Sequence, residues 1–258
     1  MTMKKMEIPH LSTLLLICKE AARAAGADIL EIYESADFSV EAKADNSPLT
    51  LADKAAHNRI VSFLEETNIP ILSEEGRAIP YEERKNWDYF WMIDPLDGTK
   101  EFIKKNGEFT VNIALIHEGR PILGVVYPPV LDLMYTAIEG EGAQLDGVQI
   151  HVSEKTLDQP NLRTVASRSH MSAETEEFLA RLKQPEIVSK GSSLKLLLIA
   201  SGEADVYPRF GPTMEWDTAA AHVIVTEAGG QVVHTDLENP IRYNKEDLLN
   251  PFFVVLAF

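Results

Sequence analysis

The sequence is poor in the residues that mark secreted or membrane-spanning proteins. It has one cysteine, Cys18, so no disulfide can form within the chain, and this is typical of a reducing compartment. No apolar run approaches the ~20 residues of a membrane span, and the N-terminal segment lacks the apolar core of a signal peptide. We therefore expect a cytoplasmic protein without a transmembrane segment. A peripheral position on the inner face of the cell membrane stays open.

Positive charge is also scarce. Lysine and arginine number 24 against 40 aspartates and glutamates, which gives a net charge of −16, and the longest Lys/Arg cluster has two residues. This pattern argues against a nucleic-acid partner. With 258 residues, of which 45% are hydrophobic, the chain can bury a core in one large domain or in two tightly joined ones.

The most informative stretch that is present runs from Trp91 to Phe102. The apolar residues 89–93 predict a buried strand, which ends at Asp94-Pro95 and is followed by Asp97. A strand that stops in this way turns back, so both carboxylates can point into one volume. At about 4 Å and an effective dielectric near 20 they would repel by roughly 4 kcal/mol. Either one carboxylate is protonated or a cation lies between them, and we interpret the stretch as a metal site.

The residues after Asp97 favour a bound phosphate. Gly98 permits close approach to the backbone, and Asp97 can cap a short helical turn whose free N–H groups favour an anion. Thr99 adds a hydroxyl beside the metal. Carboxylates for Mg²⁺ next to a phosphate cradle indicate phosphoryl chemistry. An ordinary Asp-rich turn after a strand remains the alternative.

Three further acids fall at the ends of expected elements. Glu74 follows a short apolar strand at residues 69–72, and a solvated turn is its alternative interpretation. Asp53 stands three residues after Thr50 at the start of a helix that runs to about Thr67, which resembles a capping box. Asp217 begins a helix that extends through residue 228. For Asp53 and Asp217, the residues alone favour capping.

The remaining pattern predicts an α/β protein in two parts. A long helix is expected from about Leu11 to Tyr33, and strands at residues 110–116, 121–127, 131–138 and 150–152 predict an antiparallel meander. The polar residues 155–161 mark a transition. We therefore predict an N-terminal α+β domain over residues 1–155 and a C-terminal α/β domain over residues 156–258, with a smaller sheet that supplies Asp217 and substrate contacts.

Together, these motifs resemble the metal-dependent, lithium-sensitive phosphatases of the inositol monophosphatase superfamily. The similarity is greatest to one branch, the bacterial 3′(2′),5′-bisphosphate nucleotidases. It implies an α/β fold of the layered αβαβα sandwich type. The sequence differs from the family pattern at Leu49 and Leu51, beside Asp53, and at Met214 and Glu215, before Trp216. None of these differences falls on a candidate ligand. The resembling segments are residues 43–53, 72–75, 94–110, 167–170, 191–195, 207–213 and 216–217.

The resemblance implies a role for each acid. Asp53 and Thr99 would form the catalytic pair that orients and deprotonates a metal-activated water for direct in-line attack, without a phosphoenzyme. The ligands of two or three Mg²⁺ ions would be Glu74, Asp94, the carbonyl of Leu96, Asp97 and Asp217. Contacts to the substrate would come from Glu74, Asp97, Gly98, Thr99, Ser169, His170, Ser192, Ser193, Lys195, Arg209 and Asp217.

The implied reaction is removal of the 3′-phosphate from adenosine 3′,5′-bisphosphate, a nucleotide bisphosphate, to give AMP during sulfate assimilation and nucleotide recycling. A second phosphate needs further positive charge, for which Lys100, Lys195 and Arg209 are candidates, and the guanidinium offers a bidentate fork. Hydrolysis of inositol or fructose phosphates by the same mechanism is the alternative. A non-catalytic acidic module that binds divalent metal is a more distant one.

Overall fold

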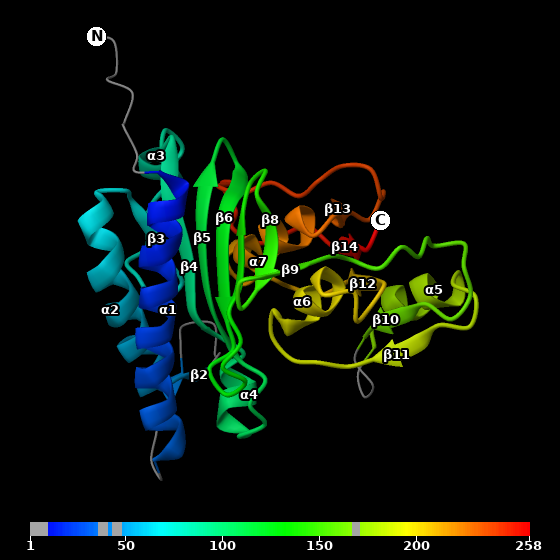
Figure 1. The fold of residues 1–258 in the computed structure, drawn as a ribbon, viewed down its shortest axis with the longest axis horizontal. Helices are drawn as coiled ribbons and strands as arrows, with labels where there is room; N and C mark the ends of the chain where they lie inside the picture. The colour runs from blue at the N-terminus through cyan, green and yellow to red at the C-terminus, as the bar shows by residue number, and fades with distance from the viewer. Residues whose placement is uncertain (1–9, 36–40, 43–47, 167–170) are drawn as a thin grey trace.

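The computed structural model describes residues 10–35, 41–42, 48–166 and 171–258. The two larger sheets and the helices between and beside them stack in layers (Figure 1), and a third sheet has only two strands. In order, the layers are a helix pair, a large sheet, a second helix pair, a small sheet and a last helix. This is the αβαβα sandwich expected from the sequence.

The large sheet has seven strands in the order β3-β4-β5-β6-β7-β8-β9. Strands β3 and β4 pair in parallel, whereas every later pair is antiparallel, which confirms the predicted meander. The strands are β3 (Ile71–Ser73), β4 (Tyr89–Asp97), β5 (Thr110–His117), β6 (Arg120–Tyr127), β7 (Tyr135–Ile138), β8 (Gly142–Leu145) and β9 (Val148–Ile150).

One face of this sheet is covered by α1 (Leu11–Glu34) and α2 (Leu51–Leu64). Apolar residues recur along α1 at helical spacing, so its buried side, including Leu14 and Ile29, packs on the strands. Cys18 is fully buried there as a core residue. The remaining elements of this half are β1 (Glu41–Ala42), β2 (Pro48–Leu49), the 3₁₀ helix η1 (Glu65–Thr67), α3 (Tyr81–Arg84) and α4 (Thr99–Ile103).

The other face is covered by α6 (Leu194–Ala200) and α7 (Glu215–Glu227), which separate it from the small sheet. That sheet has the order β11-β10-β12-β14-β13, and α5 (Ala173–Ala180) lies on its outer side. Its strands are β10 (Arg163–Val165), β11 (Glu186–Val188), β12 (Val206–Arg209), β13 (Gln231–His234) and β14 (Phe253–Leu256).

The contact between α7 and the large sheet is unusually close. A Cβ built on Gly124 of β6 would lie 2.4 Å from the carbonyl oxygen of Ala220 and 2.5 Å from Val223 Cγ1. Only glycine leaves room for the helix backbone at this position. The close approach fixes where the first turn of α7 projects.

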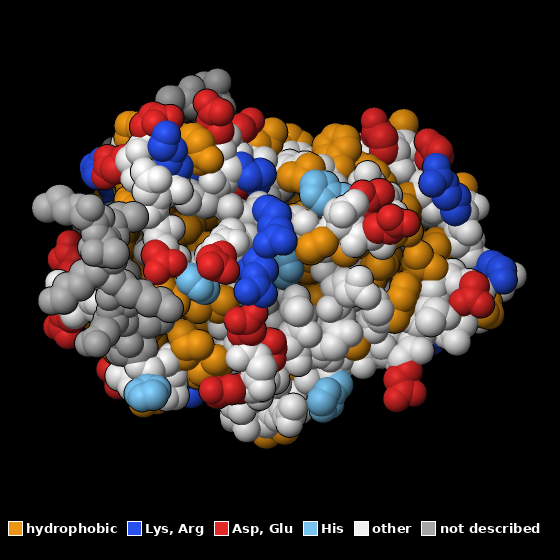
Figure 2. Space-filling model, turned by 90° about the horizontal axis from the view of Figure 1, so that it is seen from above, with side chains coloured by type: hydrophobic (Ala, Val, Ile, Leu, Met, Phe, Trp, Pro, Cys, Tyr) orange, Lys and Arg blue, Asp and Glu red, His pale blue; other side chains and the backbone are white. Residues whose placement is uncertain are grey.

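Some strand boundaries differ from the sequence-based expectation. The strand expected from residue 131 begins at Tyr135, because residues 129–132 form a turn after Pro128. The strand expected at 150–152 is β9, at 148–150. The sequence pattern did not predict strand β13. Among the described residues, no helix is both long and apolar enough to cross a membrane. From above, acidic and basic side chains lie interspersed over the surface (Figure 2).

Candidate metal-dependent active site

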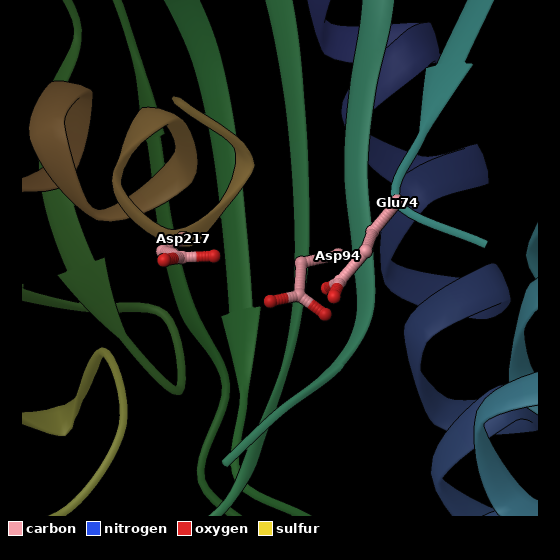
Figure 3. A group of neighbouring side chains, drawn as sticks. All are labelled: Glu74, Asp94 and Asp217. Atoms are coloured by element: carbon pink, nitrogen blue, oxygen red, sulfur yellow. The ribbon is translucent and has the colours of Figure 1, made fainter. Parts of the chain in front are cut away.

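Three carboxylates from distant parts of the chain meet at one point. One ligand oxygen from each of Glu74, Asp94 and Asp217 lies within 4.8 Å of the others (Figure 3). Glu74 follows β3 directly, Asp94 lies in β4, and Asp217 is in the first turn of α7. The parallel pairing of β3 and β4 explains why Glu74 lies close to Asp94. The pairing continues past the end of β3, where the amide of Glu74 donates to the carbonyl of Ile93 at 3.1 Å.

The cluster is unfavourable without a counter-charge. Burial, together with the charges of Glu74, Asp97 and Asp217, raises the pKa of Asp94 well above its usual value. Burial and the charge of Asp97 likewise raise the pKa of Asp217, although the Met214 amide donates to it at 2.9 Å. A divalent cation among these oxygens would relieve the repulsion.

The donor set suits Mg²⁺. The three clustered groups are carboxylates, which are hard oxygen ligands of the kind that Mg²⁺ prefers. The carbonyl oxygen of Leu96 is also a predicted metal ligand. It lies in the irregular segment between Asp94 and Asp97, where the pairing of β4 with β5 shifts register. The Leu96 amide donates to Asp94 Oδ1 at 3.1 Å, so this segment folds back onto the ligand residue.

Asp97 lies beside these three carboxylates, and hydrogen bonds from the loop before α6 hold its side chain in place. Its charge acts on both Asp94 and Asp217. Its Oδ2 accepts hydrogen bonds from Ser192 Oγ at 2.6 Å and from the Ser193 amide at 2.5 Å. Ser192 and Ser193, expected as substrate contacts, therefore contact a candidate ligand.

Asp53 and Thr99 lie within hydrogen-bond distance. Thr99 Oγ1 donates to Asp53 Oδ1 at 3.2 Å, while Asp53 Oδ2 accepts from the amide of Thr50 at 2.8 Å and from its hydroxyl at 2.5 Å. Asp53 is buried and closes the predicted capping box of α2. One carboxyl group thus caps the helix and contacts the threonine, so the two interpretations of Asp53 are compatible. Its catalytic role stays a prediction.

Gly98 makes the tight turn between β4 and α4. Its φ of 95° is in the left-handed region, and an added Cβ would lie 3.0 Å from the Glu108 carbonyl oxygen and 3.2 Å from Ser192 Cβ. A side chain here would be strained and would press on the loop that contacts Asp97.

A cavity of about 270 Å³ lies against Asp217 of this cluster and adjoins a larger one of about 590 Å³. The smaller is lined by Asp97, Gly98, Ser192 and Asp217, among others. The residues shared by both cavities are Glu101, Lys195, Tyr207 and Arg209. Two cationic side chains therefore stand where the cavities join.

These two cations are partly anchored. Arg209 donates from Nε to Thr213 Oγ1 at 2.8 Å and from a terminal nitrogen to the Pro212 carbonyl at 2.9 Å, while Lys195 Nζ donates to the Ser192 carbonyl at 3.2 Å. Lys100 is exposed and lines neither cavity. The predicted contacts Ser169 and His170 lie outside the described residues.

Sequence reasoning missed two polar residues of β5, Thr110 and Asn112. Both are buried, at 0% and 1% exposure, and both contact the serines that hold Asp97. The available signal was a polar-apolar-polar alternation at the start of an otherwise apolar strand.

Comparison with known proteins gives one consistent result. A family model described as the inositol monophosphatase family matches residues 10–253. The 3′(2′),5′-bisphosphate nucleotidase CysQ of Escherichia coli K12 is 48% identical over 244 residues, covering 93% of this chain and 98% of the relative. A crystal structure of CysQ from Bacteroides thetaiotaomicron, a bacterial member of the same family, is 47% identical with a TM-score of 0.84, covering 96% and 98% of the two chains. An inositol monophosphatase from Anabaena is 28% identical with a TM-score of 0.73, covering 96% and 91%.

Proposed function

This chain belongs to the inositol monophosphatase family, and we propose that it is a Mg²⁺-dependent phosphatase that converts adenosine 3′,5′-bisphosphate to AMP and phosphate. The observation that carries the proposal is the meeting of Glu74, Asp94 and Asp217 beside two joined cavities. The similarity to 3′(2′),5′-bisphosphate nucleotidases over 93% of the chain supports the choice of substrate.

In this proposal, the carboxylates bind the Mg²⁺ cofactor. We propose that Glu74, Asp94, Asp97 and Asp217, with the carbonyl of Leu96, bind two or three Mg²⁺ ions. Bound Mg²⁺ supplies a more acidic water and neutralises charge on the phosphoryl oxygens and on the leaving oxygen. The raised pKa values of Asp94 and Asp217 fit this assignment, because they reflect burial and then close carboxylates, and a cation would stabilise both groups as anions.

In this proposal, Asp53 and Thr99 remove a proton from the attacking water. With Thr99 Oγ1 already donating to Asp53 Oδ1, the hydroxyl can accept a proton from an attacking water as it passes its own to the carboxylate. The remaining oxygen of Asp53 is fixed by both donors of Thr50, so the carboxylate does not rotate away. Attack on phosphorus is then direct and in line.

The joined cavities suit a substrate with two phosphates. We propose that the 3′-phosphate lies against Asp97, Gly98 and Thr99 in the smaller cavity, while Lys195 and Arg209 contact the second phosphate at the junction. Lys104 and Lys190 line the larger cavity and add positive charge there. A singly phosphorylated inositol would give Lys195 and Arg209 no second phosphate to contact.

Phosphate release from three substrates tests the proposal. Adenosine 3′,5′-bisphosphate, inositol 1-phosphate and fructose 1,6-bisphosphate are supplied at equal concentration, with Mg²⁺ or with excess chelator. We expect the nucleotide to give the highest kcat/KM and the chelator to abolish release from all three. Faster turnover of inositol 1-phosphate or of the fructose ester would contradict the nucleotide assignment.

A non-catalytic metal-binding module makes a different prediction for the same assay. It would release no phosphate from any ester, and Thr99→Ala would change nothing. The Thr99–Asp53 hydrogen bond, which such a module does not need, favours catalysis. A role in sulfate assimilation, a cytoplasmic location and peripheral membrane contact remain predictions from the sequence.

A further inference from the structure

A buried polar cluster lies behind Asp97, where the first half of the chain meets the second. Thr110 and Asn112 come from β5, where they pair with Asp97 and Asp94 across the β4–β5 ladder. Ser193 comes from the loop before α6 and is 2% exposed. Polar groups buried this deeply cost free energy unless each finds a hydrogen-bond partner.

Five short contacts join the side chains of the cluster. Thr110 Oγ1 lies 2.8 Å from Ser192 Oγ, 2.7 Å from Ser193 Oγ and 3.1 Å from the amide end of Asn112. Ser193 Oγ also lies 3.0 Å from that amide end. The fifth contact is the 2.6 Å hydrogen bond from Ser192 Oγ to Asp97 Oδ2.

The number of hydrogens decides how these contacts are made. Each contact needs one hydrogen, and the three hydroxyl groups supply three. If Asn112 presents its oxygen to Thr110 and Ser193, two of the five contacts have no hydrogen. That orientation also buries Nδ2 without a hydrogen-bond partner among the described residues, which is costly for a group with two donors.

Turning the amide over removes the shortage. The oxygen and nitrogen of an asparagine amide have nearly the same shape, so the surrounding network decides between them. With nitrogen toward Thr110 and Ser193, two N–H groups join the three hydroxyls, and five hydrogens serve five contacts. One buried acceptor then remains unpaired, in place of two unpaired N–H groups.

We propose that Asn112 donates both its amide hydrogens into this cluster and thereby starts a one-way chain of hydrogen bonds that ends on Asp97 Oδ2. Asn112 donates to Thr110 and to Ser193, Ser193 donates to Thr110, Thr110 donates to Ser192, and Ser192 donates to Asp97. Each of the three hydroxyl groups donates one hydrogen bond and accepts at most two, which is within the capacity of a hydroxyl.

The chain makes Asn112, Thr110 and Ser193 positioning residues for Asp97. It fixes Oδ2 from behind, while no hydrogen bond from the described residues reaches Oδ1, so that oxygen is available to a cation. The Ser193 amide reinforces the same oxygen at 2.5 Å. Groups that orient a metal ligand in this way typically change metal affinity or activity by about 10- to 100-fold when they are removed. This inference rests on the proposed function in taking Asp97 as a metal ligand.

The loop that carries the serines is itself held in place. The amide of Gly191 donates to Glu108 Oε2 at 2.7 Å, and a Cβ at Gly191 would lie 2.8 Å from Glu101 Cγ. Ser192 has a φ of 53°, which is unusual for a residue with a side chain. The hydroxyl of Ser192 is thus presented to Asp97 by a constrained backbone.

Metal binding by matched variants tests the chain. Thr110→Val keeps the shape of the side chain but has no hydroxyl, whereas Thr110→Ser keeps the hydroxyl. We expect calorimetry with Mn²⁺ and metal-free protein to show about tenfold weaker binding for Thr110→Val, with Thr110→Ser within about threefold of the parent chain. Equal Mn²⁺ affinity in Thr110→Val and the parent chain would overturn the proposal.

Neutron diffraction from crystals of the parent chain in deuterated solvent gives a second test that does not depend on a variant folding. We expect two deuterons on the Asn112 amide atom that faces Thr110 and Ser193. Density for an oxygen in that position would overturn the proposal.

Neither readout uses a substrate, so the two proposals can fail separately. If Thr110→Val weakens Mn²⁺ binding while no nucleotide is hydrolysed, the proposed function falls and the positioning chain stands. If nucleotide is hydrolysed while Thr110→Val binds Mn²⁺ normally, the positioning chain falls alone.

Discussion

At the residue scale, the site depends on carboxylates held closer together than their charges favour. Asp94 shows this most clearly, because it is 2% exposed and lies among Glu74, Asp97 and Asp217. In the absence of metal, its negative charge therefore opposes folding. A substitution that removes the charge but keeps the shape should stabilise the metal-free protein while it weakens metal binding.

Asp94→Asn has an effect on stability that depends on pH. The pKa of Asp94 is raised in the folded chain, so its protonation favours folding below the unfolded pKa, and this benefit is lost as pH rises through the folded pKa. With chelator at pH 7, we expect the variant to exceed the parent chain in free energy of unfolding by on the order of 1 kcal/mol or more. The difference should shrink as the pH falls toward 4.

Urea unfolding of both proteins with chelator at several pH values measures this difference. Glu246→Gln, at an exposed position, is the control and should show no such trend. A parent chain that is as stable as Asp94→Asn at pH 7 would show that the cluster is not repulsive.

Arg209→Ala tests the second-phosphate contact. Loss of a charged donor to phosphate is worth about 1.5 to 3 kcal/mol, so we expect KM for adenosine 3′,5′-bisphosphate to rise by roughly tenfold or more. KM for a singly phosphorylated nucleotide should change much less. Steady-state kinetics on both substrates gives the comparison.

Arg181→Ala is the matched control, because Arg181 is exposed, pairs with Glu177 and lines neither cavity. Equal effects of Arg209→Ala on both substrates would remove Arg209 from the second-phosphate site. They would instead indicate that its hydrogen bonds to Pro212 and Thr213 hold the loop in shape.

At the element scale, the sequence predicts where the acids fall along the chain but not how they meet. Glu74 directly follows β3 and Asp94 lies in the neighbouring β4, so their proximity follows once the two strands are known to pair in parallel. Asp217 is different, because α7 must cross the opposite face of the sheet. Its position depends on the close packing at Gly124, which no local pattern in the sequence reveals.

Gly124→Ala should therefore act on the site from a distance. The new methyl group would clash with the Ala220 carbonyl, so α7 must move outward, at a cost of about 1 to 3 kcal/mol. Since α7 carries Asp217, we expect Mg²⁺ affinity to fall together with the melting temperature.

Gly140→Ala separates the two effects. Its Cβ would meet no atom of the described residues within 4 Å, but its φ of 81° strains any side chain. We expect this variant to lose stability with unchanged Mg²⁺ affinity, as measured by calorimetry. If Gly124→Ala also leaves Mg²⁺ affinity unchanged, the packing of α7 does not position Asp217.

At the scale of the whole molecule, the layered fold could be predicted because periodicity and turn residues mark most of its elements. The long helix and the meander have strong local patterns, and the structure confirms both. Strand β13 was missed because its four residues follow Gly229-Gly230 directly and have little pattern of their own. The proposed division near residue 155 stays a prediction, and α7 packs against strands of both sheets across it.

The roles of buried polar residues could not be predicted, because they depend on contacts between distant segments. Thr110 meets Ser193 across 83 positions of sequence, and Asp97 meets Ser193 across 96. The polar-apolar-polar start of β5 marks these residues, but it does not show which distant side chains they contact. For Asp53, the local pattern predicted only its role as a cap, and its contact with Thr99 was expected only through the family resemblance.

Metal binding should also stabilise the whole molecule. A ligand that binds only the folded chain adds about 2.7 kcal/mol at 100 times its Kd, which for a chain of this length raises Tm by roughly 5 to 10 °C. We therefore expect Mg²⁺ to raise Tm in a thermal scan and excess chelator to reverse the shift. Asp94→Asn should lose most of the increase, and an equal Mg²⁺ shift in that variant would place the cation elsewhere.

The most direct test of the account is anomalous diffraction from a crystal soaked in Mn²⁺, a scattering substitute for Mg²⁺. We predict that the strongest anomalous peaks lie among the carboxylate oxygens of Glu74, Asp94 and Asp217, at coordination distance from at least two of them. Strong peaks only at other positions, with these three carboxylates contacting no cation, would contradict it.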